Sequence, residues 1–140
     1  MNLSTIIRWN FGISVKDVPA LGSKKYSLVA QDSPLKNDLK ISQNTMQNDF
    51  LKITINPVNG SIASIIRKDN NEELVDNKQQ GINQYLYVPG RDPSKAESAK
   101  NVSIRIKENG PLIISLVIES EAPGTKKLSQ EIRLIKGVNR

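Results

Sequence analysis

Two short apolar runs joined by a turn sequence lie near the middle of the chain and favour a β-hairpin. The first run, residues 50–55, has apolar side chains at alternate positions, the period of a half-buried strand (Leu51, Ile53, Ile55). The turn sequence NPVNG follows at residues 56–60. Its proline restricts the preceding residue to extended backbone, and its glycine tolerates a left-handed conformation. The second run, residues 61–66, is therefore expected to return antiparallel to the first.

Further strands follow in the second half of the chain. Residues 102–107 alternate between apolar and polar side chains, and the turn sequence ENGP follows at 108–111. Residues 112–119 are apolar at nearly every position, which predicts a central strand covered on both faces. A second turn, Ala122-Pro123-Gly124, leads into a strand at 128–135. Because no window has a helical period, the sequence predicts an all-β fold, an antiparallel β-sandwich.

The domain organisation is read from the polar stretches. Residues 31–37 form a polar connector, so we expect leading β-strands and this connector over residues 1–37 and a β-sandwich domain over residues 38–140. Residues 91–101, RDPSKAESAKN, contain turn formers and almost no apolar side chains, which predicts a long exposed loop. Residues 137–139 resemble the opening of a turn after the last strand. We therefore expect the sandwich domain to be truncated at its C-terminal end.

Composition restricts the chemistry that the chain can perform. Its 140 residues include no cysteine and no histidine. This excludes disulfides, zinc sites of the Cys/His kind, nucleophiles activated by histidine and a histidine general base. Only carboxylates, lysine, tyrosine or serine could act on a substrate, and a metal would need a site made of oxygen ligands.

The charge pattern is that of solvated surface residues rather than of a nucleic-acid or membrane interface. The formal net charge is +6, but the basic residues are scattered, and the doublets Lys24-Lys25 and Lys126-Lys127 lie beside turn-like glycines. Phosphate binding requires basic residues gathered on one face. No apolar run approaches the length needed to span a bilayer, and residues 1–8 are too short and too polar for a signal peptide. We expect no nucleic-acid and no membrane partner.

Four stretches of the sequence resemble the β-rich C-terminal region of family 38 glycoside hydrolases, the α-mannosidases. The most specific is the hairpin segment 48–76, in which strand, proline-containing turn, glycine, strand and an ELVD ending occur together. The other three stretches are VKDVPALGSKKY (15–26), NQYLYVPG (83–90) and ENGPLIISLVIESEAPGTKKLSQEIRLIKG (108–137). Together they cover most of the chain from Val15 onward.

The resemblance implies a non-catalytic part of a larger hydrolase. The expected fold is a β-sandwich of the galactose-mutarotase-like kind, part of a supersandwich that supports a preceding catalytic module. The family's chemistry implies a retaining mannosidase with an aspartate nucleophile and a zinc ion held by histidine and aspartate ligands. Because this chain has no histidine, zinc is expected only in the catalytic module of the parent protein. No catalytic residue, metal ligand or cofactor is assigned to this chain, whose expected partners are that module and mannosides.

Tyr85 is the residue of this chain that the resemblance assigns to the substrate. In the resembling enzymes a tyrosine in the strand equivalent to NQYLYVP projects from the sandwich, and its hydroxyl hydrogen-bonds the bound sugar. Tyr85 matches that position, and Tyr87 lies two residues further on the same side of the strand. The alternative is that Tyr85 is a packed ring with its hydroxyl at the wet margin, as is usual for buried tyrosine.

Three other functions remain open. A self-contained carbohydrate-binding module would present aromatic rings, but the alternation predicts that Phe50 belongs to the core. A glycosidase would need paired carboxylates. Glu72 and Glu73 are adjacent, so their side chains point to opposite faces, whereas Glu119 and Glu121 would share a face about 7 Å apart. Their position before a turn favours a solvated strand end. A structural or interaction domain is the third alternative. The aromatic residues considered for sugar stacking are Trp9, Phe11, Tyr26, Phe50, Tyr85 and Tyr87.

Overall fold

The computed structural model describes residues 17–27, 38–76, 78 and 80–138. The chain divides into two compact units, Met1–Pro34 and Leu35–Arg140. In the first unit the described residues, 17–27, contain a turn and no strand. Most of the leading segment in which β-strands were expected, residues 1–37, lies outside the described residues, so that prediction and its boundary stay predictions.

The second unit begins with a sheet of five antiparallel strands that follow one another along the chain. The predicted hairpin is its centre: Ile53 in β3 lies opposite Ile65 in β4. The strands that flank this hairpin on both sides are only two or three residues long. The sheet consists of β1 (Lys40–Ile41), β2 (Thr45–Gln47), β3 (Leu51–Ile55), β4 (Ile62–Arg67) and β5 (Glu72–Glu73).

A second sheet contains the longest strands of the described chain. Its order is β10-β9-β8, and both pairings are antiparallel. Its central strand is the one that the continuous apolar run predicts, and nearly all of its residues are buried or half-buried. Its three strands are β8 (Lys100–Asn109), β9 (Ile113–Glu121) and β10 (Leu128–Ile135).

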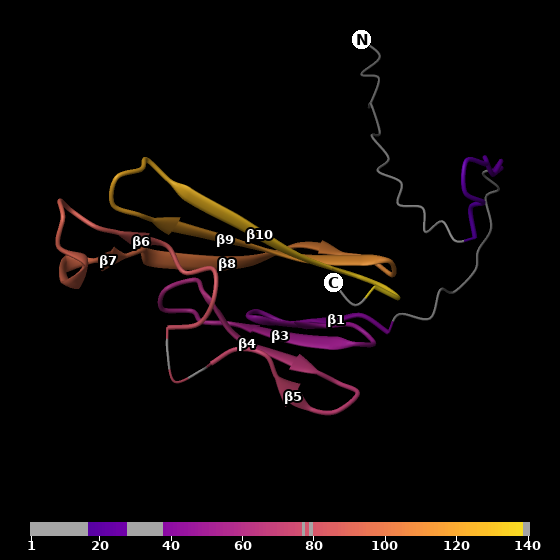
Figure 1. The fold of residues 1–140 in the computed structure, drawn as a ribbon, viewed down its shortest axis with the longest axis horizontal. Coiled ribbons are helices and arrows are strands. Elements are labelled where there is room, and N and C mark those ends of the chain that lie inside the picture. Colours follow the sequence, from indigo (N-terminus) through magenta and orange to yellow (C-terminus); the bar gives the residue numbers. More distant parts are fainter. Residues whose placement is uncertain (1–16, 28–37, 77, 79, 139–140) are drawn as a thin grey trace, which may run out of the picture. The chain divides into compact units, whose positions relative to one another are not determined.

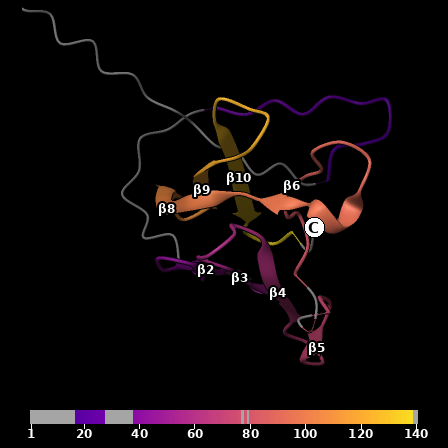
Figure 2. The ribbon, with the colours of Figure 1, turned by 90° about the vertical axis from the view of Figure 1, so that its left-hand side faces the viewer.

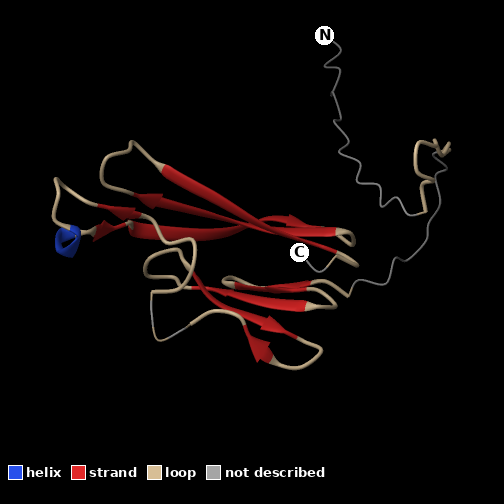
Figure 3. Cartoon of the chain, viewed as in Figure 1, coloured by secondary structure: helices blue, strands red, loops and turns tan. Residues whose placement is uncertain are grey.

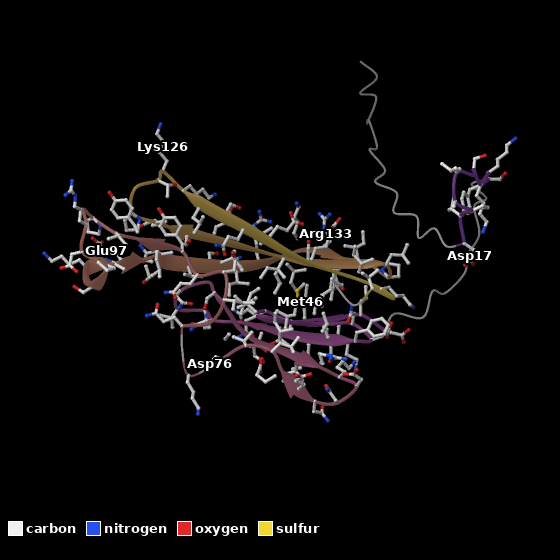
Figure 4. All side chains as sticks on the ribbon, in the orientation of Figure 1. Asp17, Met46, Asp76, Glu97, Lys126 and Arg133 are labelled. Atoms are coloured by element: carbon white, nitrogen blue, oxygen red, sulfur yellow. The ribbon has the colours of Figure 1, made fainter. Side chains whose placement is uncertain are left out.

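The two sheets pack face to face, one above the other in Figures 1 and 2. Met46 of the first sheet lies between them (Figure 4) and is fully buried. Burial of aliphatic side chains between the sheets contributes most to the stability of the fold, because aromatic residues make up only 4% of the chain. The prediction of an all-β antiparallel sandwich is confirmed. The core consists of Leu39, Met46, Ile53, Ile55, Ile114, Leu116, Ile118 and Leu134.

The turn of the central hairpin forms as its sequence predicts. The N–H of Gly60 donates to the carbonyl of Asn56, and Gly60 has a φ of +73°. A Cβ at this position would lie 3.0 Å from the Cγ2 of Ile118. Glycine therefore serves two purposes here, the left-handed backbone and the close approach of the turn to β9.

The stretch 91–101 differs from the long loop that its composition predicts. It contains a single 3-10 turn at Pro93–Lys95, then β7 (Glu97–Ser98), and its end belongs to β8. β7 pairs with β6 (Leu86–Tyr87) as a small separate sheet, and Figure 3 shows this part of the chain as strand, short helix and strand. The predicted exposure is confirmed at nearly every position, but the prediction of a loop was wrong because backbone pairing at the surface satisfies N–H and C=O groups without apolar side chains.

Asn48, in the turn between β2 and β3, joins the first sheet to the end of β10 in the second sheet through its buried side chain. Its Nδ2 donates to the carbonyls of Ile135 and Val138 at 3.1 and 2.8 Å. Its Oδ1 accepts from the N–H groups of Phe50 and Leu51 at 2.9 and 2.8 Å. The side chain is 0% exposed, so this amide is both fully buried and fully hydrogen-bonded.

Among the residues with described placement, no helix is long and apolar enough to span a membrane.

Candidate functional site

Tyr85 lies directly before β6 and packs against the turn between β9 and β10. Its hydroxyl donates a hydrogen bond to the carbonyl of Pro123 at 2.6 Å, and the residue is half-buried. The turn begins after Glu121 with the predicted sequence Ala122-Pro123-Gly124. The hydroxyl proton is therefore committed to the backbone, while the hydroxyl oxygen can still accept a hydrogen bond.

Tyr87 contacts the same turn. A Cβ on Gly124 would lie 2.7 Å from Cε2 of the Tyr87 ring, so the ring covers this glycine. Gly124 also has a φ of +78°, which glycine adopts without strain. The Tyr85 hydroxyl and the Tyr87 ring thus contact one turn, which agrees with the prediction that the two side chains share a side of the strand. We call Tyr85 and Tyr87 the tyrosine pair.

A shallow cleft of about 300 Å³ opens beside this turn and contains the two carboxylates that sequence reasoning singled out. Glu119 accepts a hydrogen bond from Lys127 at 2.9 Å and lies 3.8 Å from Arg105. Both cations lower the pKa of Glu119, Lys127 most strongly. Glu121 accepts from the Nδ2 of Asn101 at 2.8 Å. Each carboxylate is engaged by a neighbour from the protein itself, the arrangement expected of a solvated strand end.

The other two carboxylates that the sequence places side by side, Glu72 and Glu73, contact different neighbours. Glu72 lies 3.4 Å from Arg67. Glu73 accepts hydrogen bonds from the Ser64 hydroxyl and from the N–H groups of Ile65 and Val75. Desolvation raises the pKa of Glu73, but these hydrogen bonds outweigh it, and the net pKa lies below its usual value. Glu73 thus fastens β5 to β4 and stays ionised.

Phe50 is not a core residue, and this corrects the prediction from the sequence. Its side chain is 43% exposed and lines a cleft of about 660 Å³ with Leu74 and Asp49. The N–H of Phe50 bonds to Asn48 in the turn before β3. Because its position has the parity of Lys52 rather than of Ile53, its ring points away from the core. The remaining lining residues are Leu51, Arg67, Lys68 and Asp69.

The described residues contain no group of three or more histidine, cysteine, aspartate or glutamate side chains placed to hold a metal ion.

Two contacts were not predicted from the sequence. They are the Tyr85–Pro123 hydrogen bond and the hydrogen bonds of the Asn48 side chain to Ile135 and Val138. The first joins residues 38 positions apart, a distance over which local patterns carry no information. For Asn48, an asparagine directly before a strand was the one available signal, since this residue type often hydrogen-bonds nearby backbone N–H groups.

Comparison with known protein families finds a match to most of the chain. Residues 46–140 match the family model described as glycosyl hydrolases family 38 C-terminal domain. From Met46 in β2 onward, the match includes both sheets, the tyrosine pair and the turn that it contacts. The search among curated proteins found no match to the chain.

Proposed function

Because the chain belongs to the glycosyl hydrolases family 38 C-terminal domain family, we propose that it is a non-catalytic module that supports the catalytic module of such a hydrolase. In this proposal the sandwich contributes a folded platform, and bond cleavage takes place on the catalytic module. The proposed parent is an α-mannosidase, and the proposed substrates are mannosides. Its zinc ion and aspartate nucleophile are assigned to the catalytic module.

The state of the carboxylates is the observation that carries the non-catalytic role. A glycosidase needs one carboxylic acid that keeps its proton near neutral pH, which requires a raised pKa. In the described chain every carboxylate with a shifted pKa has it lowered: Glu73, Asp92, Glu119 and Glu131. The pKa of Glu131 falls to about 2 because Lys107 and Arg133 both hydrogen-bond to it. These four carboxylates are ionised, and each accepts hydrogen bonds from neighbouring residues.

The first prediction is that the purified chain does not hydrolyse aryl α-mannosides. We expect aryl release to equal the rate in buffer, with or without added zinc, because the two carboxylates that share a cleft are each engaged by neighbours from the protein itself, Glu119 by Lys127 and Glu121 by Asn101. The double variant Glu119→Gln, Glu121→Gln serves as a control and is expected to give the same background rate. Turnover that saturates with substrate and disappears in this variant would contradict the non-catalytic role.

We further propose that Tyr85 contacts the sugar in the assembled parent enzyme. Its donor is occupied by Pro123, so the hydroxyl oxygen would act as an acceptor for a sugar hydroxyl. The Pro123 carbonyl would fix the direction in which the hydroxyl lone pairs point. Tyr87, with a 38% exposed side chain, offers an adjacent apolar ring surface.

The second prediction separates this role from packing. Tyr85→Phe removes the hydroxyl and leaves the Pro123 carbonyl without its donor. In the isolated chain we expect a loss of about 1 kcal/mol in the free energy of unfolding, measured in urea. In the full-length parent we expect an additional decrease of kcat/KM, about five- to tenfold, equivalent to one hydrogen bond.

Tyr87→Phe is the matched control, because its hydroxyl makes no hydrogen bond recorded among the described residues and its ring covers the same turn. We expect this variant to keep both the stability of the chain and kcat/KM of the parent. If Tyr85→Phe lowers stability alone and leaves kcat/KM unchanged, Tyr85 is a packing residue and has no part in substrate binding.

The exposed position of Phe50 favours one second candidate, a carbohydrate-binding module that acts without the catalytic module. An aromatic ring beside a carboxylate at a cleft is a common arrangement for sugar stacking and hydroxyl recognition. Titration of the chain with mannose-terminated oligosaccharides, followed by the ring proton signals of Phe50 and Tyr85, distinguishes the two sites. Shifts at Phe50 alone would support the independent module.

A further inference from the structure

The chain contains two Asn-Gly steps, Asn59-Gly60 and Asn109-Gly110, and both lie in turns between antiparallel strands. An asparagine that precedes a glycine can react with its own backbone, because glycine has no side chain to hinder the approach of its nitrogen to the asparagine carboxamide. No other asparagine in the sequence precedes a glycine. The two steps have the same reactive groups, so their folded surroundings decide which of them reacts.

The glycine nitrogens of the two steps are held in the same way. The N–H of Gly60 donates to the carbonyl of Asn56 at 2.9 Å. The N–H of Gly110 donates to the carbonyl of Ile113, also at 2.9 Å. Because the nitrogen must leave this bond before it can react, the backbone imposes a similar requirement at both steps. The difference between them therefore comes from the asparagine side chains and from the packing of each turn.

The Asn59 side chain is fixed within a packed turn. Its Oδ1 accepts from the N–H of Ser61 at 3.0 Å and from the Ser61 hydroxyl at 2.8 Å, and Ser61 is 0% exposed. Gly60 lies so close to β9 that a Cβ would be 3.0 Å from Cγ2 of Ile118. Rotation of the carboxamide toward the Gly60 nitrogen breaks both bonds to Ser61, and opening of the turn separates it from the second sheet.

Asn109 has neither restraint. It is the last residue of β8 and is exposed, and its side chain has no hydrogen-bond partner among the described residues. The connection that follows it lies at one end of the second sheet (Figure 1). Local opening at the end of a hairpin requires less free energy than opening of a turn that packs against the core. The carboxamide of Asn109 is thus free to rotate toward the nitrogen of Gly110.

We propose that Asn109 undergoes spontaneous deamidation in the folded chain and that the fold protects Asn59 from the same reaction. The nitrogen of Gly110 gives its proton to solvent and attacks Cγ of Asn109. The carboxamide C–N bond then breaks, ammonia leaves, and a succinimide ring remains. Water opens this ring at either of its carbonyls and yields aspartate or isoaspartate. The net change consumes water and releases ammonia, so it requires no oxidant, reductant or cofactor.

The reaction changes both the charge and the backbone at the end of β8. A carboxylate at position 109 lowers the formal net charge by one unit from +6. It also adds a negative charge next to Glu108, which lies 3.5 Å from Arg133. The isoaspartate form places an additional carbon atom in the main chain before the nitrogen of Gly110. We therefore expect this form to lose the Gly110–Ile113 hydrogen bond and to loosen the hairpin connection.

Peptide mapping of the chain after several days in mildly alkaline buffer tests the proposal. Deamidation raises the mass of a peptide by about 1 Da, and the aspartate and isoaspartate forms elute separately. In the folded chain we expect the reaction at Asn109 to be about tenfold or more faster than at Asn59. In urea, where neither turn is folded, we expect the two rates to converge.

Gly110→Ala is the matched variant. A Cβ at this position would lie 3.3 Å from the carbonyl oxygen of Ile113, which a small shift of the connection relieves, and it would hinder attack by its own nitrogen. We expect the rate at Asn109 to fall roughly tenfold, in buffer and in urea, with the rate at Asn59 unchanged. The measurement in urea does not depend on whether the variant folds.

Three results would overturn the proposal. The first is a folded chain that stays intact at Asn109 while the chain in urea reacts there. The second is an equal rate at Asn59 and Asn109 in the folded chain. The third is an unchanged rate at Asn109 in the Gly110→Ala variant in urea.

Discussion

Replacing Asn48 by aspartate is expected to lower the free energy of unfolding by about 3 to 5 kcal/mol at pH 7. The two N–H groups of the Asn48 side chain donate to the carbonyls of Ile135 and Val138. A carboxylate has no donor and would direct negative charge at both carbonyl oxygens in a fully buried site. Urea unfolding followed by circular dichroism measures this loss.

The same variant is expected to depend on pH in a defined direction. Burial raises the pKa of the introduced carboxyl in the folded state above its value in the unfolded chain. Protonation as the pH falls therefore favours the folded state and restores one donor, so the deficit relative to the unmodified chain is smaller at pH 4 than at pH 7. Asn44→Asp is the control, since its side-chain amide makes only long bonds at a half-buried site: it donates to the carbonyl of Ile55 at 3.4 Å and accepts from the Thr45 hydroxyl at 3.5 Å. A deficit that is equal for both variants, or constant with pH, would contradict this role of Asn48.

Leu116→Ala is the second substitution with a large expected effect. Leu116 is 0% exposed at the middle of β9, within the core between the sheets. Truncation leaves a cavity that the neighbouring β-branched side chains cannot fill by simple rotation, because each has a restricted χ1 angle. We expect a loss of about 3 kcal/mol in the free energy of unfolding, within the usual range of about 2 to 5 kcal/mol.

Ile106→Ala provides the matched control from the neighbouring strand. Ile106 lies directly opposite Leu116 in the register of β8 and β9, but its side chain is 45% exposed. It therefore loses less buried area, and we expect a decrease of about 1 kcal/mol. Both values come from urea unfolding at a single pH. Equal losses in the two variants would mean that the core does not lie between the sheets as described.

The sequence predicted the elements whose determinants are local. The turn at Asn56–Gly60 formed because proline and glycine limit the backbone there, and β9 is central because its apolar residues are consecutive. The family resemblance, which depended mainly on the segment 48–76, is also confirmed by the match over residues 46–140. In each of these cases the deciding residues are neighbours along the chain.

The features that could not be predicted depend on distant partners. Phe50 was expected inside from the alternation of its run, but it lies in the turn after Asn48 and has the parity of Lys52, so its ring is directed outward. β7 has no apolar pattern, and its pairing with β6 satisfies backbone groups alone. The partner of the Tyr85 hydroxyl is a carbonyl 38 residues away. Pairings of this kind become visible only in the folded chain.

The buried amide of Asn48 also determines how the two sheets are aligned. Aliphatic side chains from facing sheets can interlock in more than one way, and sliding one sheet by two residues moves it roughly 7 Å while keeping apolar groups in contact. Such a shift would separate Asn48 from the carbonyls of Ile135 and Val138 and leave a polar group buried without partners, which costs about 1 to 3 kcal/mol. One polar side chain thus disfavours the misaligned sandwiches that the aliphatic core by itself would tolerate.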